Sequence, residues 1–405
     1  MPSNLMEPVN TVAPAGQPAG AKPARPGRPR RGLILVIAGV LLIGAAVVFR
    51  VALVPSLLKL PTNLDKTAHF AGQQFAYVDP GTGAPLSRPH RLPLAISRHV
   101  TADPKASGGE RIVLDEAVTA TVKGAPPLRQ HNRYVMDRKS AVNVSDPRAY
   151  AFTPANKVDR SGAYRLAFGF DVPDGKPIEL YSNDTDSTYQ ATPDARTSSG
   201  DVEGNRALNY EIHQRPHRLS AVYLAGLEHA IGLPASTTLN ELSRGLRRAG
   251  LDLPAVVAAL PAADQARIAA LQRKPIPLLY EESLSGRIAI EPKTGLLANL
   301  FNERITVTVR PNPNGIAPLA AILNRNDGVA AVRSALPKLR AASSHAQPVF
   351  ALDYHQTPAS VAETADDISS ASRQLSVAKL WLPLLLAALG IGFVALGARR
   401  ARRAR

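Results

Sequence analysis

The chain has 405 residues, of which 48 are Lys or Arg, 32 are Asp or Glu and none is Cys, giving a formal net charge of +16. The absence of cysteine excludes disulfides, zinc–thiolate sites and cysteine nucleophiles. Two short tails, residues 1–31 and 398–405, hold ten of the basic residues and one acid, which leaves 38 basic residues against 31 acids elsewhere. The positive charge of the two tails lies beside apolar segments, where attraction to anionic lipid headgroups explains it. We therefore expect no nucleic-acid partner.

Two apolar segments lie near the ends of the chain, Leu33–Phe49 and Leu380–Gly397. Each is about long enough to cross a bilayer core of roughly 30 Å at about 1.5 Å per residue. We therefore predict one transmembrane helix within residues 32–55 and a second over 380–397. The first segment is longer than the apolar part of a signal peptide and no small-residue cleavage site follows it, so we expect an uncleaved anchor.

The tails set the expected orientation. Residues 1–31 combine seven prolines with glycine, alanine and arginine, a composition that predicts a disordered segment. Basic flanks of membrane helices stay on the cytoplasmic side, and each tail carries five basic residues. We therefore expect a two-pass plasma-membrane protein with both termini, 1–31 and 398–405, in the cytoplasm and an extracytoplasmic domain over residues 56–356.

The domain between the spans is predicted to be α+β, with a large antiparallel sheet. Short segments of alternating apolar and polar residues, bounded by Pro, Gly, Asp or Asn, indicate strands within residues 68–225. After a helical interruption, strands resume on either side of an expected turn at Ser285-Gly286, and a further strand follows Pro292–Gly295. The expected strands are 69–78, 111–122, 132–137, 164–170, 206–213, 277–284, 287–291, 296–310 and 349–354.

Residues 236–273 have helical character and are predicted to form a small inserted cluster of three helices. Thr238 and Glu241 have the spacing of a capping box, and Gly250 is a plausible end of the first helix. The cluster is either a structural cap over the sheet or a binding apex. In the second interpretation its leucines line or cover an apolar pocket. The candidate ligand-binding residues are Leu239, Leu242, Leu246, Leu260 and Leu271.

Two further helical regions are expected before the second span. Apolar spacing in residues 311–345 predicts one or two helices, broken at Asn326–Gly328 and at Pro337. Thr357 followed by Pro358 supplies an N-cap and a first-turn proline, so a membrane-proximal helix over 357–379 is expected to continue into the second span.

No constellation of residues indicates catalysis or metal binding. His213 and His217 have a spacing that suits metal ligation on a helix, but Pro216 lies between them and loop histidines are expected. The Asn183–Ser187 stretch resembles a calcium loop but lacks the glycine and distal glutamate, which favours an Asx-rich turn. The acids are scattered, so no carboxylate pair is nominated. We expect no enzyme activity, no cofactor and no metal.

The order of these features resembles that of the actinobacterial envelope proteins of the porin PorA family. The resemblance spans roughly residues 33–397 and rests on the paired terminal helices and on short polar and aromatic motifs, none of them catalytic. The motifs are Arg133-Tyr134 with Asp137-Arg138, Tyr164–Leu166 with Phe168 and Phe170, Lys176 with Tyr181 and Asp184, Ile290–Gly295 and the helix Val361–Lys379. The helical insertion at 236–273 departs from the pattern.

The resemblance implies an envelope membrane protein with a channel-like role. Strand-built porins carry an apolar outer band and no hydrophobic helix, whereas this chain has two such helices. We therefore expect the domain to bind or transfer an apolar envelope component, with membrane lipid as partner, or to scaffold another envelope protein. A channel component and, less favoured, an envelope enzyme are the alternatives.

Overall fold

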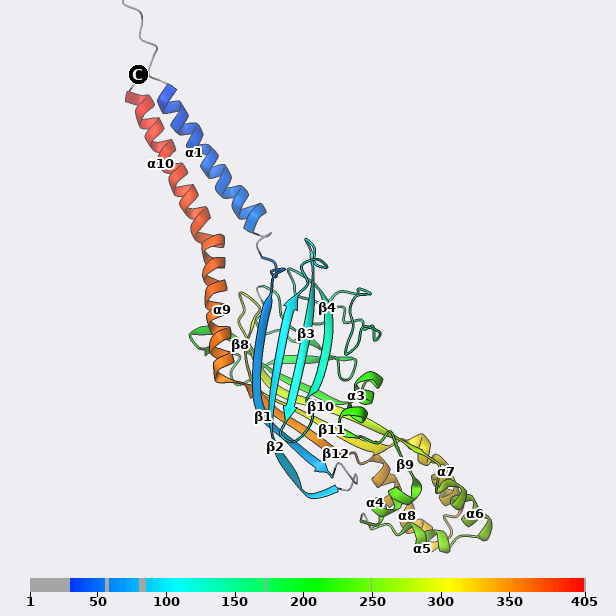
Figure 1. Ribbon diagram of the computed structural model, residues 1–405. Helices are drawn as coiled ribbons and strands as arrows, with labels where there is room; N and C mark the ends of the chain where they lie inside the picture. The colour runs from blue at the N-terminus through cyan, green and yellow to red at the C-terminus, as the bar shows by residue number, and fades with distance from the viewer. Residues whose placement is uncertain are drawn as a thin grey trace, which may run out of the picture. The chain divides into compact units, whose positions relative to one another are not determined.

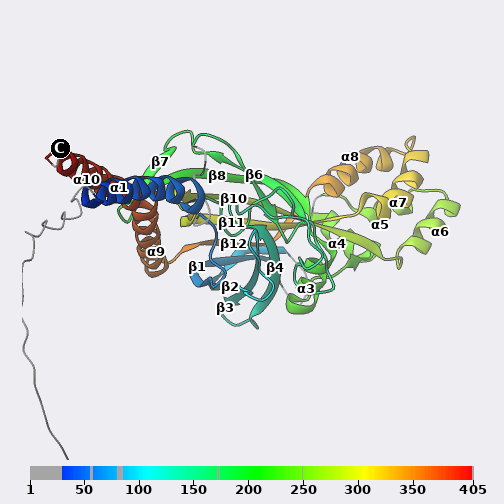
Figure 2. The ribbon, with the colours of Figure 1, turned by 90° about the horizontal axis from the view of Figure 1, so that it is seen from above.

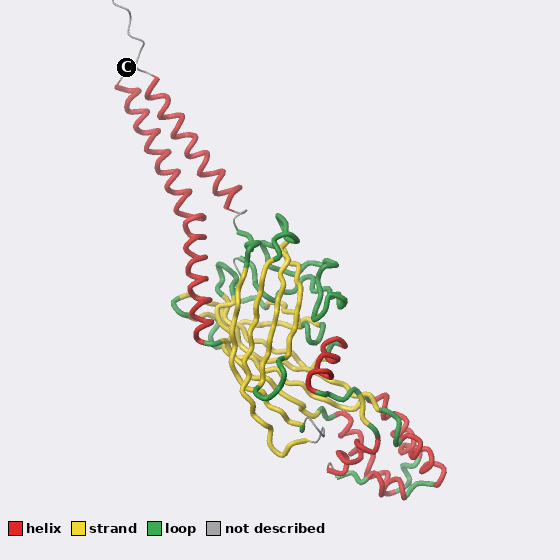
Figure 3. The backbone as a smooth tube through the Cα atoms, viewed as in Figure 1, coloured by secondary structure: helices red, strands yellow, loops and turns green. Residues whose placement is uncertain are grey.

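A computed structural model describes residues 30–54, 58–79, 85–170, 172, 174–248 and 250–403. The predicted disordered tail, 1–31, lies outside these residues except for its last two. The chain divides into two compact units, Met1–Val54 with Ala378–Arg405, and Pro55–Val377. The second unit contains strands and helices, so the α+β prediction is confirmed (Figure 1, Figure 3).

The first unit is a pair of apolar helices. Helix α1 (Arg30–Val48) continues as the π-helical segment η1 (Phe49–Leu53), and α10 (Leu382–Arg403) follows the π-helical η2 (Val377–Trp381). The two helices approach closely, because a Cβ added to Gly39 would lie 2.5 Å from the Gly390 carbonyl oxygen. Both helical stretches, Leu33–Ala52 and Pro358–Arg403, are long and apolar enough to cross a membrane.

The second unit is built on a 12-stranded sheet with order β4-β3-β2-β1-β12-β11-β10-β8-β6-β5, in which β7 and β9 pair with β8 and β10. Successive strands of this path pair antiparallel. The strands are β1 (Asp65–Val78), β2 (Pro85–Ala102), β3 (Arg111–Val122), β4 (Leu128–Asp137), β5 (Ile178–Ser182), β6 (Ser187–Pro193), β7 (Ser199–Val202), β8 (Asn205–Arg218), β9 (Ser236–Thr237), β10 (Ile276–Ile290), β11 (Leu297–Pro311) and β12 (Gln347–Gln356).

The sheet closes on itself through two short irregular segments between its edge strands. Residues 142–144 hydrogen-bond to β4, residues 162–164 hydrogen-bond to β5, and the two segments hydrogen-bond to each other, so backbone bonds run round a complete barrel. The N–H to carbonyl bonds of this seam are Val144 to Val135 at 2.9 Å, Asn143 to Ala163 at 3.0 Å, Tyr164 to Glu179 at 2.9 Å and Tyr181 to Tyr164 at 3.1 Å.

Arg160 links the two sides of the seam through side-chain hydrogen bonds. Its guanidinium donates to the carbonyl of Arg133 on β4 at 3.0 Å, to the carbonyl of Tyr150 at 2.9 Å and to the side chain of Asn183 after β5 at 2.9 Å. It also lies 4.3 Å from the ring centroid of Tyr134. One buried side chain therefore joins both edges of the open path.

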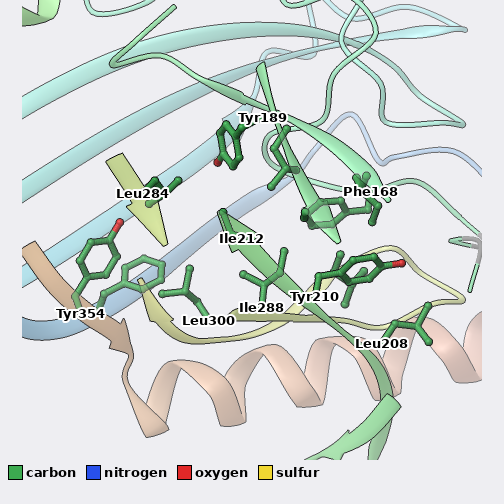
Figure 4. Packing of buried hydrophobic residues seen from close by; sticks show 14 of the residues in the cluster. Phe168, Tyr189, Leu208, Tyr210, Ile212, Leu284, Ile288, Leu300 and Tyr354 are labelled. Atoms are coloured by element: carbon green, nitrogen blue, oxygen red, sulfur yellow. The ribbon is translucent and has the colours of Figure 1, made fainter. Parts of the chain in front are cut away.

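The barrel is polar outside and mostly apolar inside. Exposed positions on β8, for example, are Glu211, His213 and Arg215. Among the described residues, the strongly exposed large hydrophobic side chains all lie between Leu33 and Val51 or between Val377 and Leu396. The described strands therefore lack the apolar outer band of a membrane-spanning barrel. The interior core includes Phe70, Leu94, Ile96, Leu180, Tyr189, Leu208, Ile212, Leu284, Ile288, Leu300 and Tyr354 (Figure 4).

Helices pack at both ends of the β10–β11 hairpin. We call residues 236–274 and 313–344 the helical module; it lies beyond the start of β10 and the end of β11 (Figures 1 and 2). At the other end of the hairpin, α9 (Pro358–Ser376) packs on Ala289 and Ala298. The remaining helices are α3 (Ala221–Ile231) and, within the module, α4 (Leu239–Arg248), α5 (Leu253–Ala258), α6 (Ala262–Leu271), α7 (Pro313–Arg325) and α8 (Ala330–Ser344).

Local signals predicted several elements well. The capping box forms, with the Thr238 N–H 2.8 Å from a Glu241 carboxylate oxygen and the Glu241 N–H 3.3 Å from the Thr238 hydroxyl. Gly250 adopts φ +80° after α4. The side chain of Thr357 caps α9, which continues through η2 into α10 as expected.

Other predictions were wrong. The expected strand 164–170 is irregular, because its residues line the barrel seam and interior. Strand β10 passes through Ser285-Gly286 without a turn, since both residues pair with β8 and β11. Pro337 lies inside α8 and does not end it. The proline-containing strand β2 and helix α3 were not predicted.

Replacing Arg160 by Ala should destabilise the barrel by about 3 kcal/mol, because several buried acceptors on both edges lose their charged donor. Thermal unfolding of the full-length protein in detergent, followed by circular dichroism, measures the change. Arg129→Ala, at an exposed position on β4, is the control and should leave Tm nearly unchanged. Equal Tm shifts for the two variants would contradict the role of Arg160 in closing the barrel.

Candidate functional site

Six ionisable side chains lie close together inside the barrel, and their charges shift the pKa of four of them, Glu116, Arg165, Asp184 and Glu282. They come from β2, β3, β10, β11, the seam segment and the turn after β5. Burying this many charges is unfavourable unless each is paired, so such a group is a candidate for function. We call Arg98, Glu116, Arg165, Asp184, Glu282 and Glu303 the ionisable cluster.

Glu116 is the well-satisfied member of the ionisable cluster. It accepts hydrogen bonds from the Tyr134 hydroxyl at 2.7 Å and the Asn132 amide at 2.8 Å, and the Arg98 guanidinium lies 3.2 Å away. Burial raises the pKa of Glu116, but Arg98, Arg165 and the two hydrogen bonds outweigh burial and hold the pKa below its usual range. Glu116 is therefore an ionised structural anchor, linked through Tyr134 and Asn183 to the seam.

Asp184 and Glu282 are in the opposite situation. Burial raises the pKa of Asp184 to about 6; Arg165 opposes this shift, while Glu303 and Glu116 add to it. Burial, Asp184 and Glu303 raise the pKa of Glu282 well above its usual value, again against Arg165. Neighbouring carboxyls that cannot all ionise share protons, as coupled acids do.

Some hydrogen-bonding capacity of the cluster is unused. Among the described residues, four cluster atoms are buried without a hydrogen-bond partner: Oε2 of Glu282, Nε of Arg165, Oε1 of Glu116 and Nε of Arg98. The last two face each other in an ion pair at 3.2 Å, whereas Glu282 Oε2 and Arg165 Nε have no such partner. Glu303, by contrast, accepts a hydrogen bond from the Tyr354 hydroxyl. Unpaired buried polar atoms are rare in folded proteins, and they mark places where a further polar group fits.

Solvent reaches part of this group. Glu116 and Glu282 are fully buried, but Arg165, Asp184 and Glu303 keep part of their accessible surface although they lie deep in the domain. The polar cluster also adjoins the apolar interior, since Tyr354 contacts Glu303 and Leu284 lies two residues from Glu282 on the same face of β10. Figure 4 shows Tyr354 and Leu284 among the apolar side chains. The barrel interior therefore has a charged part and an apolar part side by side.

Two surface pockets lie outside this cluster. One, of about 400 Å³, is lined by residues 106–111 and Arg148, and the other, of about 450 Å³, by Gly72, Gln73, Phe75, Asp353 and His355. Neither pocket includes a member of the ionisable cluster.

The leucines nominated from the sequence lie in the helical module. Leu239, Leu246 and Leu260 are buried in its core, and Leu242 and Leu271 pack partly buried against that core. Their role as ligand contacts stays a prediction. His213 and His217 lie on strand β8 rather than on a helix, and the described residues contain no group of three or more metal-ligating side chains.

The ionisable cluster was missed because its carboxyls come from distant parts of the sequence. One signal was available: Arg98 follows Leu94 and Ile96 at alternate positions, and Glu282 precedes Leu284 in the same way. Strand side chains two residues apart share a face, so both charges were placed on an apolar face. Sequence alone cannot show that these faces belong to one interior.

A family comparison matches residues 31–399 to the family described as porin PorA. The chain belongs to the porin PorA family. The match covers nearly the whole chain, so the resemblance inferred from the residues is confirmed. No curated protein matches the chain. Together with the two apolar helices, membership of the porin PorA family identifies a membrane protein of the cell envelope.

The raised pKa of Asp184 makes barrel stability depend on pH. A carboxyl with a folded-state pKa near 6 stabilises the fold fully below its unfolded value of about 4, and the stabilisation is lost as pH rises through about 6. Asp184→Asn should therefore stabilise the protein by about 2 kcal/mol at pH 7.5, with no gain at pH 4.

The measurement is the difference in Tm between Asp184→Asn and the wild type across this pH range. Glu211→Gln, at an exposed position on the outer face of β8, serves as the control and should give a flat difference. Destabilisation by Asp184→Asn at pH 7.5 would show that the charge on Asp184 is compensated.

Proposed function

We propose that the barrel binds an amphiphilic component of the envelope, with its polar part at the ionisable cluster and its apolar part against the interior wall. The observation that carries this proposal is the adjacency, within one closed barrel, of unpaired buried polar atoms and a large apolar interior. A polar group that pairs with Glu282 and Arg165 would recover hydrogen bonds that these side chains now lack. An apolar helix is joined to each end of the domain, so membrane lipid is the nearest source of such a ligand.

The channel interpretation rests on the family name and finds less support in the geometry. The α1–α10 pair packs through Gly39 and Gly390, and its other faces carry exposed leucine, isoleucine and valine. Two such helices do not enclose an aqueous path, so conduction would require several chains with polar helix faces. Scaffolding of another envelope protein remains compatible with the same architecture.

We further propose the two-pass arrangement, with both basic tails in the cytoplasm and residues 56–356 outside. The support is the charge beside each span, five basic residues on either tail, together with the polar outer face of the barrel. This orientation exposes the barrel to the compartment in which envelope components are assembled.

The binding proposal predicts where a photoactivatable acyl lipid reacts. Cells fed with such a lipid are irradiated, the full-length protein is purified, and cross-linked peptides are mapped by mass spectrometry. We expect cross-links in β8 and β10 in addition to those in α1 and α10, which lipid labels in any membrane protein. Ile288→Trp, which fills the interior, should remove the barrel cross-links, whereas Glu211→Trp on the outer face should not.

The positions of the cross-links also distinguish the candidate sites. If the cross-links lie at Leu239, Leu242, Leu246, Leu260 or Leu271 and not in β8 and β10, the binding site is in the helical module. Labelling confined to α1 and α10 would contradict lipid binding by the domain, and ion conductance of the purified protein in planar bilayers would then favour the channel.

The orientation predicts the behaviour of reporter fusions at residues 5 and 405. Both fusions should be active as cytoplasmic reporters, because both tails are basic and two crossings return the chain to its starting side. A fusion in the exposed segment around Gly108 and Gly109 provides the opposite control. An extracytoplasmic signal from either terminus would disprove the two-pass arrangement.

A further inference from the structure

The positive charge of the domain is concentrated in the helical module. Residues 236–274 and 313–344 contain ten basic residues and four acids, a formal excess of +6. The chain outside the two tails has an excess of +7, so the barrel and the remaining segments are almost neutral. The cations that the structure places on the module surface are Arg244, Arg247, Arg267, Arg273, Lys274, Arg325, Arg333, Lys338 and Arg340.

Two of the module's four acids, Asp264 and Glu241, serve its own structure. Asp264 is buried and accepts hydrogen bonds from Arg267 at 2.9 Å and from the Asn326 amide at 2.8 Å, with Arg325 at 3.5 Å. Glu241 completes the capping box of α4. Asp252 and Asp327 are exposed, so the module surface carries nine described cations against few acids and stays cationic.

The module lies at the opposite end of the domain from the segments that lead to the spans. It follows the start of β10, whereas α9 packs on the other end of β10 and β11, and Lys66 near the start of β1 pairs with Asp367 of α9 at 2.6 Å. Strands of 15 residues separate the two ends by about 50 Å, at about 3.3 Å per residue.

The character of this surface decides the class of partner. Its cations are spread over α4, α6, α7 and α8, and neither surface pocket described above includes a residue of the module. None of the strongly exposed large hydrophobic side chains among the described residues lies in the module. A broad cationic surface without exposed apolar anchors fits an extended anionic surface that it touches without inserting.

We propose that the helical module docks electrostatically on an anionic lipid surface, at the end of the domain opposite α9 and the start of β1. This docking is independent of what the barrel holds. Its affinity should fall steeply with ionic strength, because exposed charges are screened by salt.

The test uses the full-length protein in nanodiscs of phosphatidylcholine, mixed with sedimentable vesicles. We expect co-sedimentation with vesicles of equal parts phosphatidylcholine and phosphatidylglycerol at low salt, little at high salt, and little with pure phosphatidylcholine. Charge reversal by R273E/K274E should weaken binding about tenfold or more, since each basic residue near such a surface contributes appreciably. Arg273 and Lys274 are exposed and make no ion pair among the described residues, so the fold should survive.

The matched control is K123E/R129E, which reverses two exposed charges, one in the turn after β3 and one near the start of β4, and should bind like the wild type. Equal loss in both double variants would mean that net charge alone drives binding and would overturn the proposal. Equal binding to neutral and anionic vesicles would also overturn it. Binding of heparin without binding of anionic vesicles would assign the module to a soluble polyanion instead.

Discussion

Closure of the sheet is the constraint on which the rest of the domain depends. The edge strands β4 and β5 do not pair directly; two three-residue segments and the guanidinium of Arg160 bridge them. An open sheet of this length would leave two unpaired edges, which favour association with other chains. Closure removes these edges and creates an interior in which charges from distant strands become neighbours.

That interior explains why the ionisable cluster is unusual. Glu116 is compensated by Arg98 and by two hydrogen bonds, and it belongs to the network that holds the seam. Arg165 compensates Asp184 and Glu282 only in part, so burial still raises the pKa of both. A fold that needed only stability would be better served by apolar residues at these positions. The proposed ligand therefore pairs with the Asp184 and Glu282 side of the cluster, whereas Glu116 and Arg98 belong to the structure of the seam.

Much of the fold follows from local sequence, whereas the candidate site does not. The capping box of α4, the N-cap of α9 and the long alternating strand β3 depend on neighbours within a few residues, and they were predicted correctly. The irregular stretch 164–170 has a strand-like alternation, but the seam determines its conformation. The cluster depends on strand order and closure, which pair β2 with β1 and β10 with β8 and β11. The residues near each strand in the sequence do not show which strands it pairs with.

The central claim is that the barrel interior holds an amphiphile. Its most direct test is an experimental density map of the full-length protein extracted from its native membrane without added lipid. We expect elongated non-protein density inside the barrel, with its polar end next to Glu282 and Arg165 and its tail along Tyr189 and Ile288. An interior filled only by protein side chains and water would contradict the claim.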